Sequence, residues 1–180
     1  RVQSQLADLS GMRRGHVRVT SGAETLRHFL PDVIARYRSE YSAVTFDVSR
    51  QHGEAAEAAL ASLETDLALI FEPIRHSDFQ TVATTRQAVY CFMAETHDLA
   101  QLKTIRLHHL IDTPVILPTT HSGVRQLLNV GLIRRNINLA AMLETDSQEF
   151  TQNYVHNEQV IGFQIPIGLP PDMANGRPVD

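Results

Sequence analysis

Cysteine is nearly absent from this sequence of 180 residues, which contains only Cys91. A single cysteine cannot form an intramolecular disulfide or a cysteine-based metal cluster. Cys91 also lies within an apolar, strand-like pattern, which is the setting of a buried structural residue and not of a reactive thiolate. The sequence therefore predicts neither a disulfide scaffold nor a cysteine nucleophile.

Long apolar runs and an excess of positive charge are missing as well. No run approaches the roughly 20 apolar residues of a membrane-spanning helix, and the first residues lack the apolar core of a signal peptide. The net charge of −4 provides no general attraction for nucleic acid. We therefore predict a cytoplasmic chain that contacts no membrane and does not bind DNA specifically by itself. Because it starts at Arg1 and not at Met, we expect it to be a fragment of a longer protein.

The motifs of common enzyme and metal sites are also missing. No two of the nine histidines are spaced i, i+4 on a predicted helix, and His108 and His109 are adjacent, so their side chains point apart. The sequence contains no nucleophile elbow, phosphate loop or dinucleotide fingerprint. We predict no catalytic residue, no cofactor and no metal site.

Residues 15–41 organise the chain. Residues 16–20 alternate between apolar and polar, which predicts a strand, and Ser21 and Glu24 form the S-x-x-E pattern of a helical capping box. One long amphipathic helix is predicted after the strand from apolar residues with a period of 3.6, namely Leu26, Phe29, Leu30, Val33, Ile34 and Tyr37. A strand that ends at a helix N-terminus places free N–H groups at the sheet edge, where open α/β sheets bind ligands.

The rest of the chain repeats this alternation of strands and helices. Strands at 44–50 and 66–71 with a helix at 54–63 between them predict a parallel β-α-β-α-β unit. Residues 79–85 are predicted to be an extended connector. A second series follows it, with strands expected at 88–93, 114–117, 139–143 and 160–163 and helices at 124–135 and about 146–156.

Two groups of hydroxyl residues fall where a strand is followed by a helix. One is Ser21, and the other consists of Thr119, Thr120 and Ser122. Such hydroxyls often only cap helices. Alternatively, two helix N-termini that face one cleft would hold a small anion. Neither junction contains Lys or Arg, at 20–24 or at 118–123, so the anion would be held by dipoles and hydroxyls.

The order and spacing of several short motifs resemble the effector-binding domain of LysR-type transcriptional regulators, over essentially all of residues 5–180. Residues 15–19 match its opening strand and residues 29–31 match its "LLP". Residues 66–70 resemble its "DLAI" strand, and residues 97–100 resemble "HPLA". Two departures are Leu63, where the family often has Gly, and residues 158–166, which replace its "G-x-G-I-A-L-L-P".

The resemblance implies an α/β, two-lobed fold like the type 2 periplasmic binding proteins, each lobe a mixed sheet flanked by helices. Residues 1–14 would be the end of a linker helix and a linker, 15–84 the first lobe, 85–168 the second, and 169–180 a truncated return segment. It also implies a homodimer or tetramer that binds DNA only through an N-terminal helix-turn-helix domain outside this chain.

The family's effector contacts can be carried over residue by residue. The implied contacts are Thr20, Ser21, Gly22, His52, Gly53, Pro118, Thr119 and Thr120, with Phe163 as a pocket wall. We therefore predict a domain that senses a small-molecule effector, which we expect to be a small carboxylate or another anion. The alternative is a solute-binding protein of a transport system, which would need a signal peptide or a lipid anchor.

Overall fold

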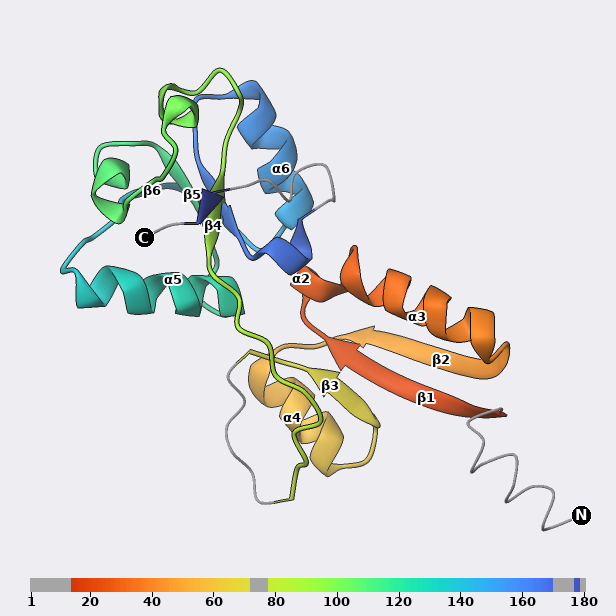
Figure 1. Ribbon diagram of the computed structural model, residues 1–180. Helices are drawn as coiled ribbons and strands as arrows, with labels where there is room; N and C mark the ends of the chain where they lie inside the picture. Colours follow the sequence, from red (N-terminus) through yellow and green to blue (C-terminus); the bar gives the residue numbers. More distant parts are fainter. Residues whose placement is uncertain (1–13, 72–77, 170–176, 179–180) are drawn as a thin grey trace, which may run out of the picture. The chain divides into compact units, whose positions relative to one another are not determined.

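The computed structural model describes residues 14–71, 78–169 and 177–178 (Figure 1). The chain forms two compact units, residues 1–80 and 81–180. The predicted end of a linker helix and linker at 1–14 lies outside the described residues except for Arg14, which begins the first strand, and most of the predicted return segment at 169–180 also lies outside them. In the part of the chain that is described, no helix has the length and apolar character needed to cross a membrane.

The first unit contains a three-stranded sheet with the order β2-β1-β3. Its strands are β1 (Arg14–Ser21), β2 (Ala43–Arg50) and β3 (Leu67–Leu69), and its helices are α2 (Ala23–Leu26), α3 (Phe29–Glu40) and α4 (Gly53–Ala61). The central strand, β1, pairs in parallel with β2 along its whole length and with β3 through its last three residues. The predicted parallel β-α-β-α-β unit is confirmed.

The single helix predicted after β1 is wrong, because α2 and α3 are separated at Arg27 and His28. Pro31 explains the break. It is the third residue of α3, where proline is tolerated, but a continuous helix would need its missing N–H to donate to the carbonyl of Arg27. The apolar periodicity continues across the break and therefore conceals it.

The capping box predicted from Ser21 and Glu24 is also not formed. Gly22 is the N-cap residue of α2, and no side chain caps the helix. The Ser21 hydroxyl instead contacts the Thr25 hydroxyl and donates to the carbonyl of Leu69 at 3.2 Å. Ser21 therefore joins the end of the central strand to the end of β3.

The start of β3 is fixed to β1 by Arg18 and Asp66. The Asp66 carboxylate accepts hydrogen bonds from the backbone N–H of Arg18 at 2.8 Å and from its guanidinium Nη2 at 2.7 Å, while the Asp66 N–H donates to the Arg18 carbonyl. The hydrogen bond from the Arg18 side chain is the main reason why the pKa of Asp66 is lowered to about 2. This pair sets the register of β3 on β1.

The second unit contains strands paired in both directions. Antiparallel strands have the order β7-β4-β8, and β5 pairs in parallel with β6. The strands are β4 (Tyr90–Phe92), β5 (Val115–Pro118), β6 (Ala141–Thr145), β7 (Gly162–Gln164) and β8 (Arg177–Pro178), and the helices are α5 (Gly123–Arg134), α6 (Gln148–Asn157) and the 3-10 helices η1 (Asp98–Gln101), η2 (Leu107–Leu110) and η3 (Pro166–Gly168). The predicted mixed α/β character is confirmed here, whereas the three described strands of the first unit are all parallel.

The core of the second unit forms where α6 packs on the strands. A buried cluster contains Phe92, Ile116, Val155, Val160 and Leu169. Gly162 permits this packing, because a Cβ atom at this position would lie 2.5 Å from Cζ of Phe92 and 2.8 Å from Cγ2 of Thr151. A side chain at 162 would push the helix or the neighbouring strand away.

Leu63 has a left-handed backbone conformation, with φ of +59°. It follows the last residues of α4, where the N–H of Glu64 donates to the carbonyl of Ala59 at 2.9 Å and so closes the helix end. Its side chain is 75% exposed and packs on little. A left-handed conformation costs a residue with a Cβ roughly 1–2 kcal/mol, whereas glycine adopts it freely. Glycine would therefore be the unstrained residue at this position.

His97 is a buried histidine that caps η1. Its Nδ1 accepts the backbone N–H of Leu99 at 3.1 Å. Burial lowers the pKa of His97, and the charge of Asp98 opposes this effect in part. Protonation of Nδ1 would also destroy the acceptor of the cap, so the neutral ring is the form that the fold stabilises.

We predict that Leu63→Gly stabilises the first unit. Relief of the left-handed strain exceeds the extra conformational entropy that glycine gives the unfolded chain, and the free energy of unfolding should rise by about 0.5–1 kcal/mol. Urea unfolding followed by circular dichroism measures the change. Leu63→Ala is the matched control, because it keeps the Cβ atom and should bring no gain; an equal gain in both variants would contradict the explanation.

We predict that His97→Asn removes part of the acid sensitivity of the fold. The pKa of His97 lies below its ordinary value of 6.5 in the folded state, so its contribution to stability is fully present above that pH and is lost as the pH falls below it. Asparagine keeps a cap acceptor but does not titrate. Thermal unfolding between about pH 7.5 and pH 5.5 should show a smaller decrease for the variant than for the unmodified chain. Parallel decreases would show that His97 is not responsible.

Candidate functional site

In the first unit, the predicted site residues Thr20, Ser21 and His52 gather where β1 and β2 end. The N–H of Gln51 donates to the carbonyl of Ser21 at 3.1 Å, which brings the two strand ends together. Thr20 and Ser21 are fully buried, and Thr20 donates its hydroxyl to the carbonyl of Ser49. Both hydroxyls therefore hold strand ends in the structure.

Gly22 and Gly53 have different reasons to be glycine at this edge. A Cβ atom at Gly22 would lie 2.5 Å from Oε2 of Glu24 and 3.2 Å from Nδ1 of His52. Gly53 has φ of +44°, a left-handed conformation, as the first residue of α4. Glycine at position 22 therefore leaves room for the Glu24 carboxylate and the His52 imidazole, which would be too close to a Cβ atom there.

Glu24 is a member of this edge that the sequence interpretation missed. The S-x-x-E pattern suggested a capping role, but its carboxylate is buried and lies beside Gly22. A carboxylate accepts hydrogen bonds from hydroxyl or ammonium groups and repels other anions. This buried carboxylate therefore places a negative charge at the first unit's edge, beside Gly22.

In the second unit, Pro118, Thr119 and Thr120 gather between β5 and α5. The N–H of Thr119 donates to the carbonyl of Thr145 at 3.2 Å, and the N–H of Ser122 donates to the carbonyl of Thr119 at 2.9 Å. The Ser122 hydroxyl caps α5 by accepting the N–H of Val124. The capping role that the sequence left open for this cluster thus belongs to Ser122.

Arg125 is a second residue that the sequence interpretation missed. It follows the junction at 118–123, and its side chain turns back toward that junction. Its Nη1 donates to the carbonyl of Pro118 at 2.8 Å and to Oε1 of Glu144 at 3.0 Å, and its Nε donates to Oδ1 of Asn129 at 3.1 Å. Helical side chains lean toward the N-terminus of their helix, and this rule could have revealed the contact.

Phe163 lies in β7, where it pairs with Cys91, and both side chains are buried in the second unit. The structure thus brings together Thr20, Ser21, Gly22, His52 and Gly53 in one unit and Pro118, Thr119 and Thr120 in the other. Within the described residues, no group of three or more His, Cys, Asp or Glu side chains is arranged to hold a metal ion.

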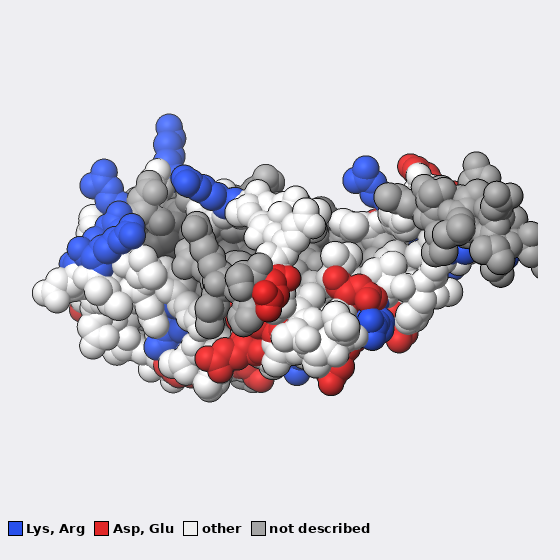
Figure 2. Space-filling view, turned by 90° about the horizontal axis from the view of Figure 1, so that it is seen from below, with Lys and Arg blue, Asp and Glu red and all other residues white. Residues whose placement is uncertain are grey.

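Charges of both signs share the face seen in Figure 2, where several Lys and Arg side chains lie near one another in part of the view and others lie beside Asp and Glu. Arg134, the last residue of α5, and Arg135, which follows it, are both exposed. Short basic regions interrupted by acidic ones give non-specific, salt-sensitive contacts at most.

Comparison with known proteins relates nearly the whole chain to one family, described as the LysR substrate binding domain, which matches residues 10–179. The HTH-type transcriptional activator CmpR of Synechocystis sp. is 21% identical over 97% of this chain and 57% of its own length. The RuBisCO operon transcriptional regulator of Acidithiobacillus ferrooxidans is 24% identical over 96% of this chain and 56% of its own length. The chain thus spans less than two thirds of the curated relatives it matches.

Solved structures with the same fold include two whose names state a bound small molecule. The effector binding domain of QuiR in complex with shikimate has a TM-score of 0.76 at 17% identity and covers 93% of this chain and 81% of that one. The CcmR regulatory domain of Synechocystis in complex with 2-PG has a TM-score of 0.79 at 18% identity and covers 93% of this chain and 82% of that one. At such identities the likeness establishes the fold.

Proposed function

We propose, on the premise that this chain belongs to the LysR substrate binding domain family, that it senses a small-molecule effector and controls a DNA-binding domain outside the chain. The observation that carries the proposal is the family match over residues 10–179. The polar strand ends of each unit add physical support, because they present hydrogen-bonding groups where α/β folds bind ligands. The predicted family and fold are confirmed by the match and by the structural neighbours.

The second unit's edge suggests the chemistry of the effector. At Thr119 and Thr120, hydroxyls lie beside the N-terminus of the 12-residue helix α5, which favours a negative group. We therefore propose a small carboxylate or another small anion, and the neighbours whose names include shikimate and 2-PG are consistent with this class.

A role in transport, the alternative that the sequence left open, lacks support, because the relatives are named as transcriptional regulators. Ligand sensing requires no chemical step, and we propose that the chain is not an enzyme. A bacterial transcription regulator works where the DNA is, so we place it in the cytoplasm. Contact with DNA would be made by the helix-turn-helix part after which these relatives are named.

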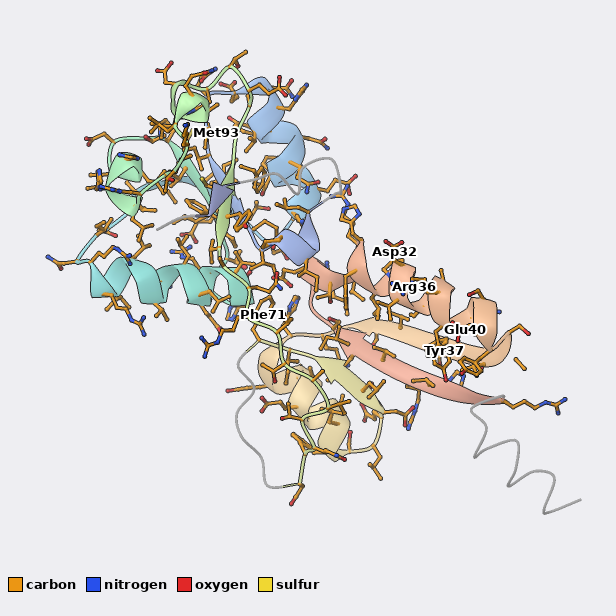
Figure 3. The ribbon with its side chains drawn as sticks, in the orientation of Figure 1. Asp32, Arg36, Tyr37, Glu40, Phe71 and Met93 are labelled. Atoms are coloured by element: carbon orange, nitrogen blue, oxygen red, sulfur yellow. The ribbon has the colours of Figure 1, made fainter. Side chains whose placement is uncertain are left out.

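We further propose that two copies associate through α3 of one and α5 of the other. In Figure 3, Asp32 and Arg36 lie on the side of α3 turned away from the sheet, whereas Tyr37 points toward β2, where its ring meets that of Phe46 edge-on. Exposed apolar side chains remain on both helices, namely Phe29 and Val33 on α3 and Val130 and Ile133 on α5. Contact between two copies would remove this apolar surface from water.

The effector can be sought by thermal shift with a panel of small hydroxy acids, amino acids and phosphorylated acids that includes shikimate and 2-PG. A ligand at 100 times its Kd raises the free energy of unfolding by about 2.7 kcal/mol, which is readily detected. We expect at least one compound of the panel to raise the unfolding temperature in a saturable way. If no compound raises it, the proposed sensing function is contradicted.

With a ligand from the panel, we predict that Thr119→Ala and Ser21→Ala each weaken binding by roughly 10- to 100-fold in calorimetry, because each removes a hydrogen bond at a ligand edge. Ser21→Ala should also lower the free energy of unfolding by about 1 kcal/mol, since the carbonyl of Leu69 loses its donor. Thr104→Ala changes an exposed threonine elsewhere and is the matched control. Unchanged affinity in both test variants would show that these edges do not bind the ligand.

We predict that Ile133→Asp prevents association of the chain. Ile133 is 77% exposed on α5, and a charge there would have to be desolvated in the proposed contact. Sedimentation velocity at tens of micromolar should show dimers for the unmodified chain and monomers for the variant. Val82→Asp places the same charge at a site that is 79% exposed and outside both helices, and it should leave the dimer intact. Dimers that persist in Ile133→Asp would exclude this contact.

A further inference from the structure

Arg125 is the one cationic side chain within hydrogen-bonding distance of the Pro118–Thr119 peptide among the residues that the structure describes. Its guanidinium donates to the carbonyl of Pro118, which belongs to the peptide unit whose N–H comes from Thr119. Only 14% of the side chain is exposed, although it lies near the start of a surface helix. A charge is thus held within one peptide unit of the proposed effector residue Thr119.

The hydrogen-bond donors of this guanidinium are only partly used. A guanidinium has five N–H groups. Nε donates to Asn129, and Nη1 donates both to Pro118 and to Glu144. No residue in the described parts of the chain accepts a hydrogen bond from Nη2, which leaves its two N–H groups available. The two N–H groups of one nitrogen diverge, so a parallel pair that matches the spacing of carboxylate or phosphate oxygens needs one of them together with an N–H of Nη1, such as the one that is now donated to Glu144.

Glu144 is the partner that can give way. Its side chain is 46% exposed, whereas that of Arg125 is largely buried. The half-exposed carboxylate of Glu144 can rotate away from Arg125 into the solvent at a small cost in free energy, because ion pairs at the surface contribute little to stability. Arg125 cannot leave as easily, because Asn129 and the carbonyl of Pro118 hold it from two sides.

We propose that Arg125 is the cationic anchor of the second unit's binding edge, and that Glu144 competes with the anionic group of the ligand for it. This inference rests on the proposed function and makes it more specific, because it replaces an anion site of hydroxyls and helix dipole alone by one with a full positive charge. The ligand class is accordingly a carboxylate or phosphate that can accept two hydrogen bonds. The Glu144 carboxylate lowers the affinity for this ligand, because it competes for the same guanidinium.

A purely structural clamp would behave differently. If Arg125 and Glu144 only held β5, β6 and α5 together, removing either partner would loosen the same contact and would weaken ligand binding in both cases. An anchor with a competing internal anion gives opposite signs: loss of Arg125 weakens anion binding, and loss of the Glu144 charge strengthens it. The sign of the effect of Glu144→Gln therefore separates the two roles.

The test titrates inorganic phosphate, as the probe, into the whole chain at constant ionic strength and follows the backbone amide signals of Thr119 and Thr120 by NMR. Phosphate should move these signals saturably in the unmodified chain. Arg125→Gln should weaken the apparent affinity about 10-fold or more, and Glu144→Gln should strengthen it about 3- to 10-fold. Arg86→Gln removes a charge from an exposed residue of the same unit and should change the affinity little. Thermal unfolding of each variant is recorded alongside.

Three results would overturn the inference: no saturable movement in either the unmodified chain or Glu144→Gln, unchanged affinity in Arg125→Gln, or weaker binding in both Arg125→Gln and Glu144→Gln with equal losses of thermal stability. Failure of the proposed function is recognised separately. If phosphate binds with the expected signs but no organic compound in the panel gives a thermal shift, the anion anchor stands and the sensing function falls. If a panel ligand binds Arg125→Gln and the unmodified chain with equal affinity, the sensing function stands and the anion anchor is excluded.

Discussion

The hydrogen bonds at the end of β1 are the constraint on which the first unit depends. The Ser21 carbonyl accepts the N–H of Gln51, and the Ser21 hydroxyl donates to the carbonyl of Leu69, so one residue ties together the ends of three strands. At the other end of the β1–β3 contact, Arg18 and Asp66 exchange backbone and side-chain hydrogen bonds. With both ends fixed, the loops that follow β1 and β2 have little freedom, and Gly22 and His52 are held close to each other.

In the second unit, a charged side chain connects the ends of neighbouring strands, where the first unit uses a hydroxyl. Its parallel strands β5 and β6 end at Pro118 and Thr145, and Arg125 connects the first of these ends to Glu144 in the second. Ser21 forms hydrogen bonds to two backbone groups and carries no charge. The guanidinium of Arg125 also joins two strand ends, but it adds a positive charge to that edge. The two edges are therefore chemically unlike, one with a carboxylate beside bare backbone and one with a cation beside hydroxyls.

Periodicity in the sequence was sufficient for the parts of the fold in which one residue pattern has one structural meaning. The alternating strand before Ser21 and the nearly all-apolar strand after Asp66 are examples, because alternation and short apolar runs between turn residues are both typical of strands. The burial on both faces that the apolar run suggested is not found, since Leu67 is 45% exposed. The division between α2 and α3 was not predictable from apolar spacing, since the spacing is unbroken and only the missing N–H of Pro31 ends the first helix. The role of Glu24 was missed because the S-x-x-E pattern indicated a helix cap, whereas the carboxylate lies beside Gly22. Arg125 was missed because it lies beyond the junction and its side chain reaches back to the carbonyl of Pro118.

The close approach at Gly162 has a consequence for how this sequence can diverge. A methyl group at 162 would overlap the ring of Phe92 and the methyl of Thr151, so neither a new side chain at 162 nor a bulkier neighbour can be accepted alone. The order in which substitutions arise therefore matters. A lineage that first shortens the residue at 92 gains freedom at 162, and a lineage that keeps the phenylalanine inherits the glycine with it.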